Sequence, residues 1–289
     1  MEQKINSELS AETTDEQRTN VEDISVRPAC IKPNVIGGFR SGKPLGIKNY
    51  GSIPHLSSSK LGEGDYFIHE GQERILTEKK RDKHDLILAF EKYDGSNVGI
   101  GKMNNQIFAL TRAGYEAKTS PYKQHHLFSE WVYKREKLFH DMLSNGERIT
   151  GEWLAQAHGL VYKIEVEPII FFDYFIGKKR VLHEELGAKA IEYGLQLPRQ
   201  LHEGEPIKVE TLLPILNKRT KGIESLGLPE GIVYRVERKG EVDFLAKWVR
   251  TDFPTGKYCI GVEEQNLIWN VALNRRERLR LCVCVGIQG

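Results

Sequence analysis

Apolar residues recur at strand-like spacing through much of the chain from about Ile47 onward. Two short apolar runs, residues 86–90 and 106–110, are typical of buried strands, because a strand covered on both faces reads as an almost continuous hydrophobic run. Later strand-like segments lie at residues 148–154, 169–175, 231–237 and 242–249. These strands are spread along the predicted body of the chain, where they are mixed with helices.

Helical spacing of apolar residues marks three further segments. Residues 122–144 repeat apolar side chains at helical intervals and end at Asn145-Gly146, a helix stop signal. Residues 183–193, which end at Gly194, and residues 209–217 are the other two predicted helices. Strands joined by hairpin-like turns, with only a few helices, predict an α+β fold with antiparallel sheets.

Both ends of the chain differ from this body. Residues 1–30 are polar, acidic and free of aromatic side chains, so they cannot bury enough surface to offset the entropy of ordering. Glycines and prolines then interrupt residues 33–64. We therefore predict a flexible acidic tail and irregular lead-in over residues 1–46, a single domain over residues 47–265, and a basic C-terminal tail or helix over residues 266–289.

The amino-acid composition suggests a cellular compartment but does not indicate a function. The 289 residues carry a formal net charge of +2, which is too small to indicate a nucleic-acid partner by bulk charge. Four cysteines are too few for a disulfide framework and suit a reducing compartment. The chain shows no apolar run long enough to cross a membrane and no signal peptide at its start. We expect a cytoplasmic protein without a membrane partner, and a nuclear location stays open.

Lys92 is the first residue with a chemical signal. It leaves an apolar strand and enters a turn formed by Asp94-Gly95, which places an amine at the mouth of a sheet. An amine is a nucleophile only when part of it is neutral, so such a lysine requires burial or nearby cations to lower its pKa. A lysine before a hairpin turn is common, and the motif alone does not decide between a nucleophile and an exposed surface residue.

The segments that follow Lys92 resemble, in order and spacing, the motifs of the covalent nucleotidyltransferases, the superfamily of polynucleotide ligases and mRNA-capping enzymes. The matching segments are Lys92-Tyr93-Asp94-Gly95, Thr111-Arg112-Ala113-Gly114, Gly151-Glu152-Trp153, Phe171-Phe172-Asp173, Glu230-Gly231-Ile232-Val233 and Phe244-Leu245-Ala246-Lys247-Trp248-Val249-Arg250. The resemblance implies a nucleotidyltransferase (ligase adenylation domain) fold with antiparallel sheets flanked by helices.

Details within the superfamily resemble the ATP-dependent RNA ligases. Glu91 directly before the lysine and Asn97 five residues after it match that family's variant of the first motif, whereas capping enzymes and DNA ligases more usually carry arginine at the position of Asn97. Residues 50–56 and 256–258 also look like parts of small RNA-ligase domains, so the resemblance covers residues 47–270. Only 39 residues follow Arg250, too few for the oligonucleotide-binding (OB) barrel of DNA ligases and capping enzymes, and we expect no appended OB barrel.

The resemblance also implies a role for each matching residue. Lys92 would attack the α-phosphorus of ATP and carry AMP, and Lys247 would neutralise the phosphate and help to lower the pKa of Lys92. Arg112 would hold a phosphate or the RNA terminus, Glu152 the ribose, and Phe172 would stack on adenine, although Phe171 remains an alternative for that ring. The remaining nucleotide-binding positions are Glu91, which would meet the adenine amino group, Asp94, Gly95, Asn97, Glu230 and Arg250.

The expected cofactors are ATP and Mg²⁺ or Mn²⁺, with the metal held by Asp94 and Glu230. The expected partners are RNA strand ends, a 5′-phosphate and a 3′-hydroxyl, with an accessory RNA-binding module or a partner in trans as a further possibility. Two other activities stay open within the enzyme class, an ATP-dependent DNA ligase and an mRNA-capping guanylyltransferase. A non-catalytic protein that binds RNA ends with a ligase-like fold is the alternative outside it.

Overall fold

The computed structural model of the protein describes residues 42–272. Inter-residue contacts divide the chain into residues 1–31 and 32–289, and the described residues all belong to the second unit. Most of the predicted acidic tail and lead-in, and most of the predicted basic C-terminal tail or helix (residues 266–289), lie outside the described residues. Within the described part, no helix is long and apolar enough to cross a membrane.

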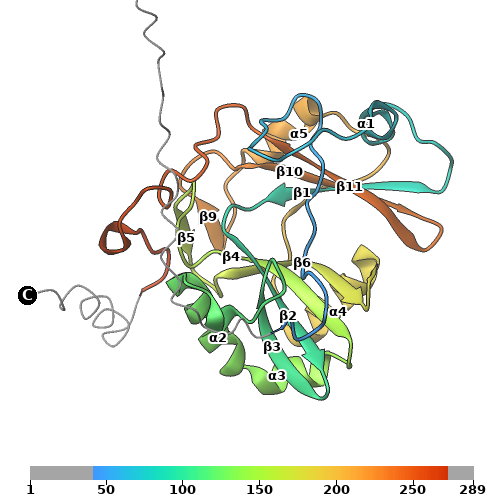
Figure 1. The fold of residues 1–289 in the computed structure, drawn as a ribbon. Helices are drawn as coiled ribbons and strands as arrows, with labels where there is room; N and C mark the ends of the chain where they lie inside the picture. Colours follow the sequence, from blue (N-terminus) through green and yellow to red (C-terminus); the bar gives the residue numbers. More distant parts are fainter. Residues whose placement is uncertain (1–41, 273–289) are drawn as a thin grey trace, which may run out of the picture. The chain divides into compact units, whose positions relative to one another are not determined.

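Two antiparallel sheets form the body of the protein, as the α+β prediction requires (Figure 1). The first has four strands in the order β11-β10-β1-β8, and β1 pairs with both β10 and β8. Its strands are β1 (Asp85–Lys92), β8 (Gln200–Gly204), β10 (Gly231–Arg238) and β11 (Glu241–Val249). The predicted strands at residues 86–90, 231–237 and 242–249 are therefore confirmed.

The second sheet has five strands in the order β3-β2-β4-β6-β7, again all antiparallel. Its strands are β2 (Ser96–Met103), β3 (Gln106–Thr111), β4 (Glu147–Trp153), β6 (Ile169–Ile176) and β7 (Lys179–Arg180). A separate two-stranded sheet joins β5 (Tyr162–Ile164) to β9 (Ile223–Ser225). Over residues 42–272 none of these sheets closes into a barrel.

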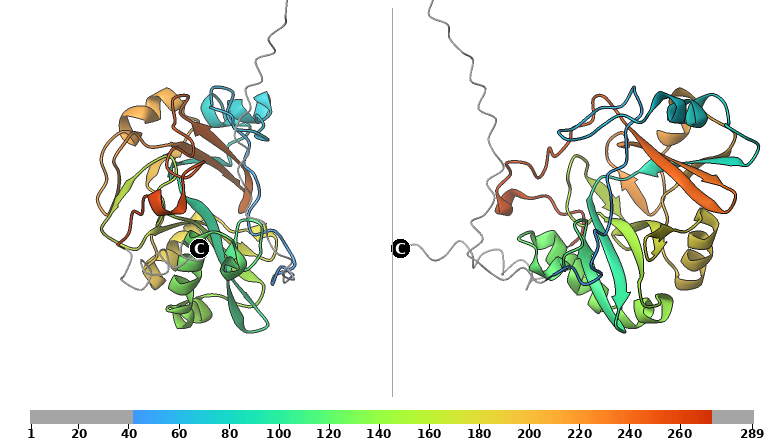
Figure 2. Two further views of the ribbon diagram at one scale, coloured as in Figure 1. Left: turned by 60° about the vertical axis from the view of Figure 1, so that its left-hand side comes forward. Right: turned by 45° about the vertical axis from the view of Figure 1, so that its right-hand side comes forward.

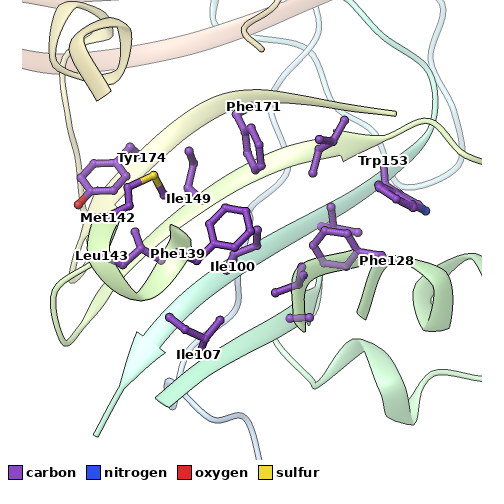
Figure 3. Packing of buried hydrophobic residues seen from close by; sticks show 14 of the residues in the cluster. Ile100, Ile107, Phe128, Phe139, Met142, Leu143, Ile149, Trp153, Phe171 and Tyr174 are labelled. Atoms are coloured by element: carbon purple, nitrogen blue, oxygen red, sulfur yellow. The ribbon is translucent and has the colours of Figure 1, made fainter. Parts of the chain in front are cut away.

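Three helices cover the outer face of the five-stranded sheet, as the further views show (Figure 2). They are α2 (Lys123–Tyr133), α3 (Glu136–Met142) and α4 (His183–Tyr193), which ends at Gly194 in the left-handed region (φ 65°). Phe128 from α2 and Phe139 from α3 pack among Ile100, Ile149 and Phe171 of the sheet (Figure 3). This cluster forms the larger hydrophobic core.

Two helices cover the outer face of the four-stranded sheet. Leu76 of α1 (Glu70–Thr77) and Leu212 of α5 (Val209–Leu216) pack against Ile87 and Tyr234 in a second core. Helix α1 has few apolar residues and the sequence did not predict it. Helices cover the outer faces of both sheets. The inner faces of the two sheets line a cavity.

The predicted helix at residues 122–144 is wrong as a single element, because α2 and α3 are separate. The backbone of Arg135 leaves the helical region (φ −119°, ψ 19°). Its guanidinium lies 4.6 Å from the centre of the Trp131 ring and pairs with Glu167, which holds the turn. After the change of direction, Phe139 of α3 contacts Phe171 of β6 with 6.4 Å between the ring centres.

Candidate active site

Lys92 lies at the end of β1 and points into the cavity between the sheets. Side chains alternate along the strand, so Ile87 and Ala89 pack under the helices, while Phe90 and Lys92 face inward. The turn after Lys92 packs closely on β4, where a Cβ on Gly95 would lie 2.5 Å from the carbonyl oxygen of Trp153. Only glycine fits at this position, which explains why the motif requires it.

Glu230 meets Lys92 across the sheet. Lys92 Nζ donates to Glu230 Oε2 at 2.6 Å, and burial raises the pKa of Glu230 to about 7. Glu230 is directly followed by β10, and a Cβ on Gly231 would lie 1.9 Å from the carbonyl oxygen of Trp248. The glycine therefore allows β10 and β11 to approach where the acid is presented.

Glu152 enters from the other sheet. Its Oε1 accepts from the Gly95 N–H at 3.1 Å, and burial raises its pKa to about 7. Asn97 pairs in register with Glu152 across β2 and β4 and also lines the cavity. Its Oδ1 atom is buried without a hydrogen-bond partner among residues 42–272. A ligand donor is the group this acceptor lacks.

Lys247 lies on β11 and lines the cavity together with Lys92 and Glu152. We call these three residues, together with Glu230, which pairs with Lys92, the lysine end. Burial and the charge of Lys92 lower the pKa of Lys247. Burial alone would lower the pKa of Lys92 as well, but the carboxylates of Glu230 and Glu152 raise it above its ordinary value. The two lysines repel each other, which favours the neutral amine, but in the ligand-free protein the two carboxylates outweigh this effect and the net pKa of Lys92 is raised.

Three predicted site residues have side chains engaged elsewhere. Asp94 Oδ2 accepts hydrogen bonds from the N–H groups of Gly159 (2.6 Å) and Leu160 (3.0 Å). These bonds hold the loop at residues 159–160 against the turn after β1. Arg250 donates to the carbonyl oxygen of Pro229 at 2.8 Å and does not line the cavity. Through these contacts, Asp94 and Arg250 stabilise the backbone next to the lysine end.

Glu91 is the third of them. It follows Phe90 and precedes Lys92, so its side chain projects from the opposite face of β1. Its Oε2 accepts from Arg199 at 2.8 Å, and Arg199 also donates to the carbonyl oxygens of Ile215 and Leu216 at the end of α5. The carboxylate of Glu91 therefore connects β1 to α5, while Glu91 is also among the residues that line the cavity.

Phe172 and Arg112 both line the cavity. Phe172 lines the cavity and contacts the Tyr50 ring edge-on at 5.2 Å between centres, whereas Phe171 is buried in the larger core. The structure thus places Phe172, and not Phe171, at the cavity. Arg112 lines its rim and donates to the Gly51 carbonyl oxygen and to Ser52 Oγ, both at 3.2 Å.

The other end of the cavity is a charged network that the sequence analysis missed. We call it the arginine end, formed by Tyr50, Asp173, Arg180 and Arg235. Asp173 accepts from the Tyr50 hydroxyl at 2.6 Å and pairs with Arg235 at 2.7 Å and with Arg180 at 2.9 Å. Tyr50 and Asp173 stand in matching motifs, but Arg235 carries no sequence signal and enters only because β10 brings it opposite β6.

The cavity between the two ends has a volume of about 180 Å³. No group of three His, Cys, Asp or Glu side chains that could hold a metal ion occurs in residues 42–272. The lysine end still suits Mg²⁺, because this ion commonly uses one or two carboxylates together with waters and substrate phosphates. Two buried carboxylates whose pKa values are raised to about 7 would be stabilised by an added cation.

Comparison with known proteins adds one firm result. A family model described as RNA ligase matches residues 85–249, more than half of the chain, and spans every motif from Lys92 to Lys247. No curated protein sequence matches the chain.

Several solved structures are similar at low identity. Naegleria gruberi RNA ligase with PPi is 14% identical, with 74% of this chain and 60% of that chain covered and a TM-score of 0.46. An archaeal ATP-dependent RNA ligase is 17% identical, with coverages of 69% and 48% and a TM-score of 0.42. A putative ATP-dependent DNA ligase from Aquifex aeolicus is 18% identical, with coverages of 71% and 57% and a TM-score of 0.42. The chain thus spans about half to three fifths of the length of these structures.

Proposed function

The chain belongs to the RNA ligase family, and we propose that it is an ATP-dependent RNA ligase with Lys92 as its nucleophile. The observation that carries this proposal is the lysine end, where Lys92 pairs with buried Glu230 and lines one cavity with the half-buried Glu152 and with Lys247. Groups with perturbed pKa values that cluster around a cavity are typical of functional sites. The cavity also offers an aromatic ring, Phe172, for a base.

The proposed reaction has three displacements at phosphorus. Neutral Lys92 Nζ attacks the α-phosphorus of ATP, a nitrogen–phosphorus bond forms, pyrophosphate leaves, and the nitrogen releases one proton to solvent. An oxygen of an RNA 5′-phosphate then attacks the same phosphorus, and the lysine nitrogen takes up a proton and leaves as the amine. Finally a 3′-hydroxyl attacks the 5′-phosphate, AMP leaves, and the hydroxyl proton passes to solvent or to a nearby base.

The remaining residues bind and orient the substrates. Lys247 and Arg112 supply positive charge for the phosphates, and Phe172 stacks on the base. Glu152 and Asn97 accept hydrogen bonds from the nucleotide, which would satisfy the Asn97 oxygen. The residues proposed only as framework are Glu91, Gly95 and Arg250.

Glu230 and Asp94 are the proposed carboxylates for Mg²⁺ or Mn²⁺. Because the backbone N–H groups of Gly159 and Leu160 already occupy Asp94 Oδ2, its other oxygen is the one available to a hydrated ion. The metal would supply positive charge that offsets the negative charge of the phosphates. Glu230 would then exchange its contact with Lys92 for contact with the ion or its waters.

The first test is to incubate the protein with α-labelled ATP or GTP and Mg²⁺. The proposal predicts a covalent label from ATP. Label from GTP alone would move the assignment to capping chemistry. No label from either nucleotide, with a folded protein, would leave a non-catalytic protein that binds RNA ends.

The second test compares nicked RNA, nicked DNA and single strands as acceptors for the labelled protein. The proposal predicts AMP transfer to an RNA 5′-phosphate and sealing to a 3′-hydroxyl. A preference for nicked DNA would support a DNA ligase instead. AMP transfer that becomes efficient only when a second RNA-binding protein is added would support an accessory partner in trans.

A further inference from the structure

A single row of side chains runs from the cavity to the edge of the four-stranded sheet. Phe90 pairs with Val233, and Val233 pairs with Lys247. Lys247 then pairs with His55, and His55 with Phe67, through two parallel bridges outside the named strands. Paired residues in neighbouring strands point to the same face of a sheet, so Phe67 shares the inner face with Lys247.

Phe67 is an exposed aromatic ring in an ordered position. It is 50% exposed, although the neighbouring backbone is fixed by the bonds from the His55 N–H to the Tyr66 oxygen (2.8 Å) and from the Ile68 N–H to the His55 oxygen (2.7 Å). Two strand spacings of ~4.8 Å separate it from Lys247, which is about 10 Å. Phe67 therefore lies just beyond the cavity on the surface that continues from it.

The charges beside Phe67 indicate which part of a ligand it contacts. Asp65 Oδ2 lies 2.9 Å from His55 Nε2, and Asp65 Oδ1 lies 3.4 Å from Lys247 Nζ. The positive charge of Lys247 is thus partly balanced on the side that faces Phe67, where a further phosphate would meet the Asp65 carboxylate. An uncharged aromatic group fits this position better than an anion does.

We propose that Phe67 stacks on the base of the 5′-terminal nucleotide of the polynucleotide acceptor. This inference rests on the proposed function, which places the 5′-phosphate at Lys92 and Lys247. The continuous row of residues then leads from that phosphate to Phe67, over a distance of the order of one nucleotide unit. Every base has an aromatic face, so a lone exposed ring serves as a platform for any sequence.

The test uses direct binding, which does not depend on catalysis. The dissociation constant of a 5′-phosphorylated RNA, fluorescently labelled at its 3′ end, is measured by anisotropy for the wild-type protein and for Phe67→Ala, Phe67→Trp and Tyr66→Ala. Phe67→Ala is expected to weaken binding about 10-fold, and Phe67→Trp to restore it. Tyr66 is 52% exposed but alternates to the face of Ile68, so Tyr66→Ala removes a similar ring and should change binding less than twofold.

A second RNA, abasic at its 5′-terminal nucleotide, identifies the group that Phe67 contacts. Wild-type protein should bind it about 10-fold more weakly than the intact RNA, and Phe67→Ala should bind both RNAs equally, because the two changes remove the same contact. Equal effects of Phe67→Ala and Tyr66→Ala, or an undiminished abasic effect in Phe67→Ala, would overturn the inference.

Labelling with ATP separates this result from the proposed function. Phe67→Ala should form the ATP adduct at the wild-type rate and with the wild-type KM for ATP. A higher KM for ATP would assign Phe67 to the nucleotide instead and overturn the inference. A wild-type protein that forms no adduct would refute the ligase proposal, whereas the binding measurements with intact and abasic RNA would still decide the role of Phe67.

Discussion

The two ends of the cavity hold charge in opposite ways. At the arginine end, Asp173 meets two guanidinium groups and the Tyr50 hydroxyl, so the buried carboxylate is fully paired. At the lysine end, burial raises the pKa values of Glu152 and Glu230 to about 7 although Lys92 lies among them. The paired charges of the arginine end hold that side of the cavity in a fixed conformation. The carboxylates of the lysine end lack sufficient positive charge in the ligand-free protein, and a substrate with its metal ion would supply it. We therefore expect substitutions at the two ends to affect different properties.

The largest change in stability is expected at the arginine end. Arg235→Met leaves buried Glu237 without its cation and Asp173 with Arg180 as its remaining cation, and the free energy of unfolding should fall by about 3 kcal/mol. Urea denaturation measures this loss. Arg238→Met is the matched control on the same strand. Its closest partner Asp82 is partly exposed, and buried Asp85, 3.9 Å away, keeps Arg81 at 2.8 Å, so the loss should be small. Equal losses of unfolding free energy in Arg235→Met and Arg238→Met would show that the buried pairs of the arginine end contribute no more than an exposed pair.

At the lysine end, a substitution should stabilise the ligand-free protein. Glu152→Gln keeps an acceptor for the Gly95 N–H but removes a carboxylate whose pKa is raised to about 7. A raised pKa means that the folded state binds more protons than the unfolded state, so the penalty grows as the pH rises from about 4.5 to about 7.

Glu152→Gln should therefore raise the free energy of unfolding by about 1–2 kcal/mol at pH 8, less than the full shift implies because the side chain borders the open cavity. Most of the gain should vanish near pH 4.5, and adduct formation with ATP should fall. Urea denaturation at the two pH values measures the gain. A loss of stability at pH 8 would show that Glu152 is as well paired as Asp173.

The smallest expected effect concerns Glu91, which belongs to neither end. Glu91→Gln removes the charge opposite Arg199 but leaves the bonds from Arg199 to α5, so the free energy of unfolding should fall by about 1 kcal/mol. The KM for ATP should stay unchanged, whereas Phe172→Ala should raise it. A raised KM for ATP in Glu91→Gln, with new labelling by GTP, would show that Glu91 contacts the base.

The lysine end was predictable from sequence because its residues stand in motifs with short-range causes. Lys92 ends a strand, Gly95 permits close packing, and Gly231 lets two strands approach. The contacts of Asp94 and Glu91 were harder to predict from sequence, because their partners Gly159 and Arg199 lie more than 60 residues away along the chain. Motif position alone does not indicate which way a side chain points.

The arginine end and the platform at Phe67 depend on tertiary structure. Arg235 reaches Asp173 because two sheets face each other, and Phe67 reaches the row of Lys247 through pairing outside regular strands. The break between α2 and α3 has a similar cause, because the packing of Arg135 on Trp131 outweighs the helical periodicity of the segment. Local pattern predicts elements, and long-range pairing decides which residues meet.

The central claim, that Lys92 carries the nucleotide, is tested most directly by mapping the adduct. The protein is incubated with ATP and Mg²⁺, digested, and analysed by mass spectrometry, alongside Lys92→Arg and Lys247→Arg. Arginine keeps the positive charge opposite Glu230 but is not an amine nucleophile, so Lys92→Arg should fold normally and carry no AMP. The account predicts AMP on Lys92 in the wild-type protein and, at a reduced rate, in Lys247→Arg. AMP on another residue, or an adduct that persists in Lys92→Arg, would contradict it.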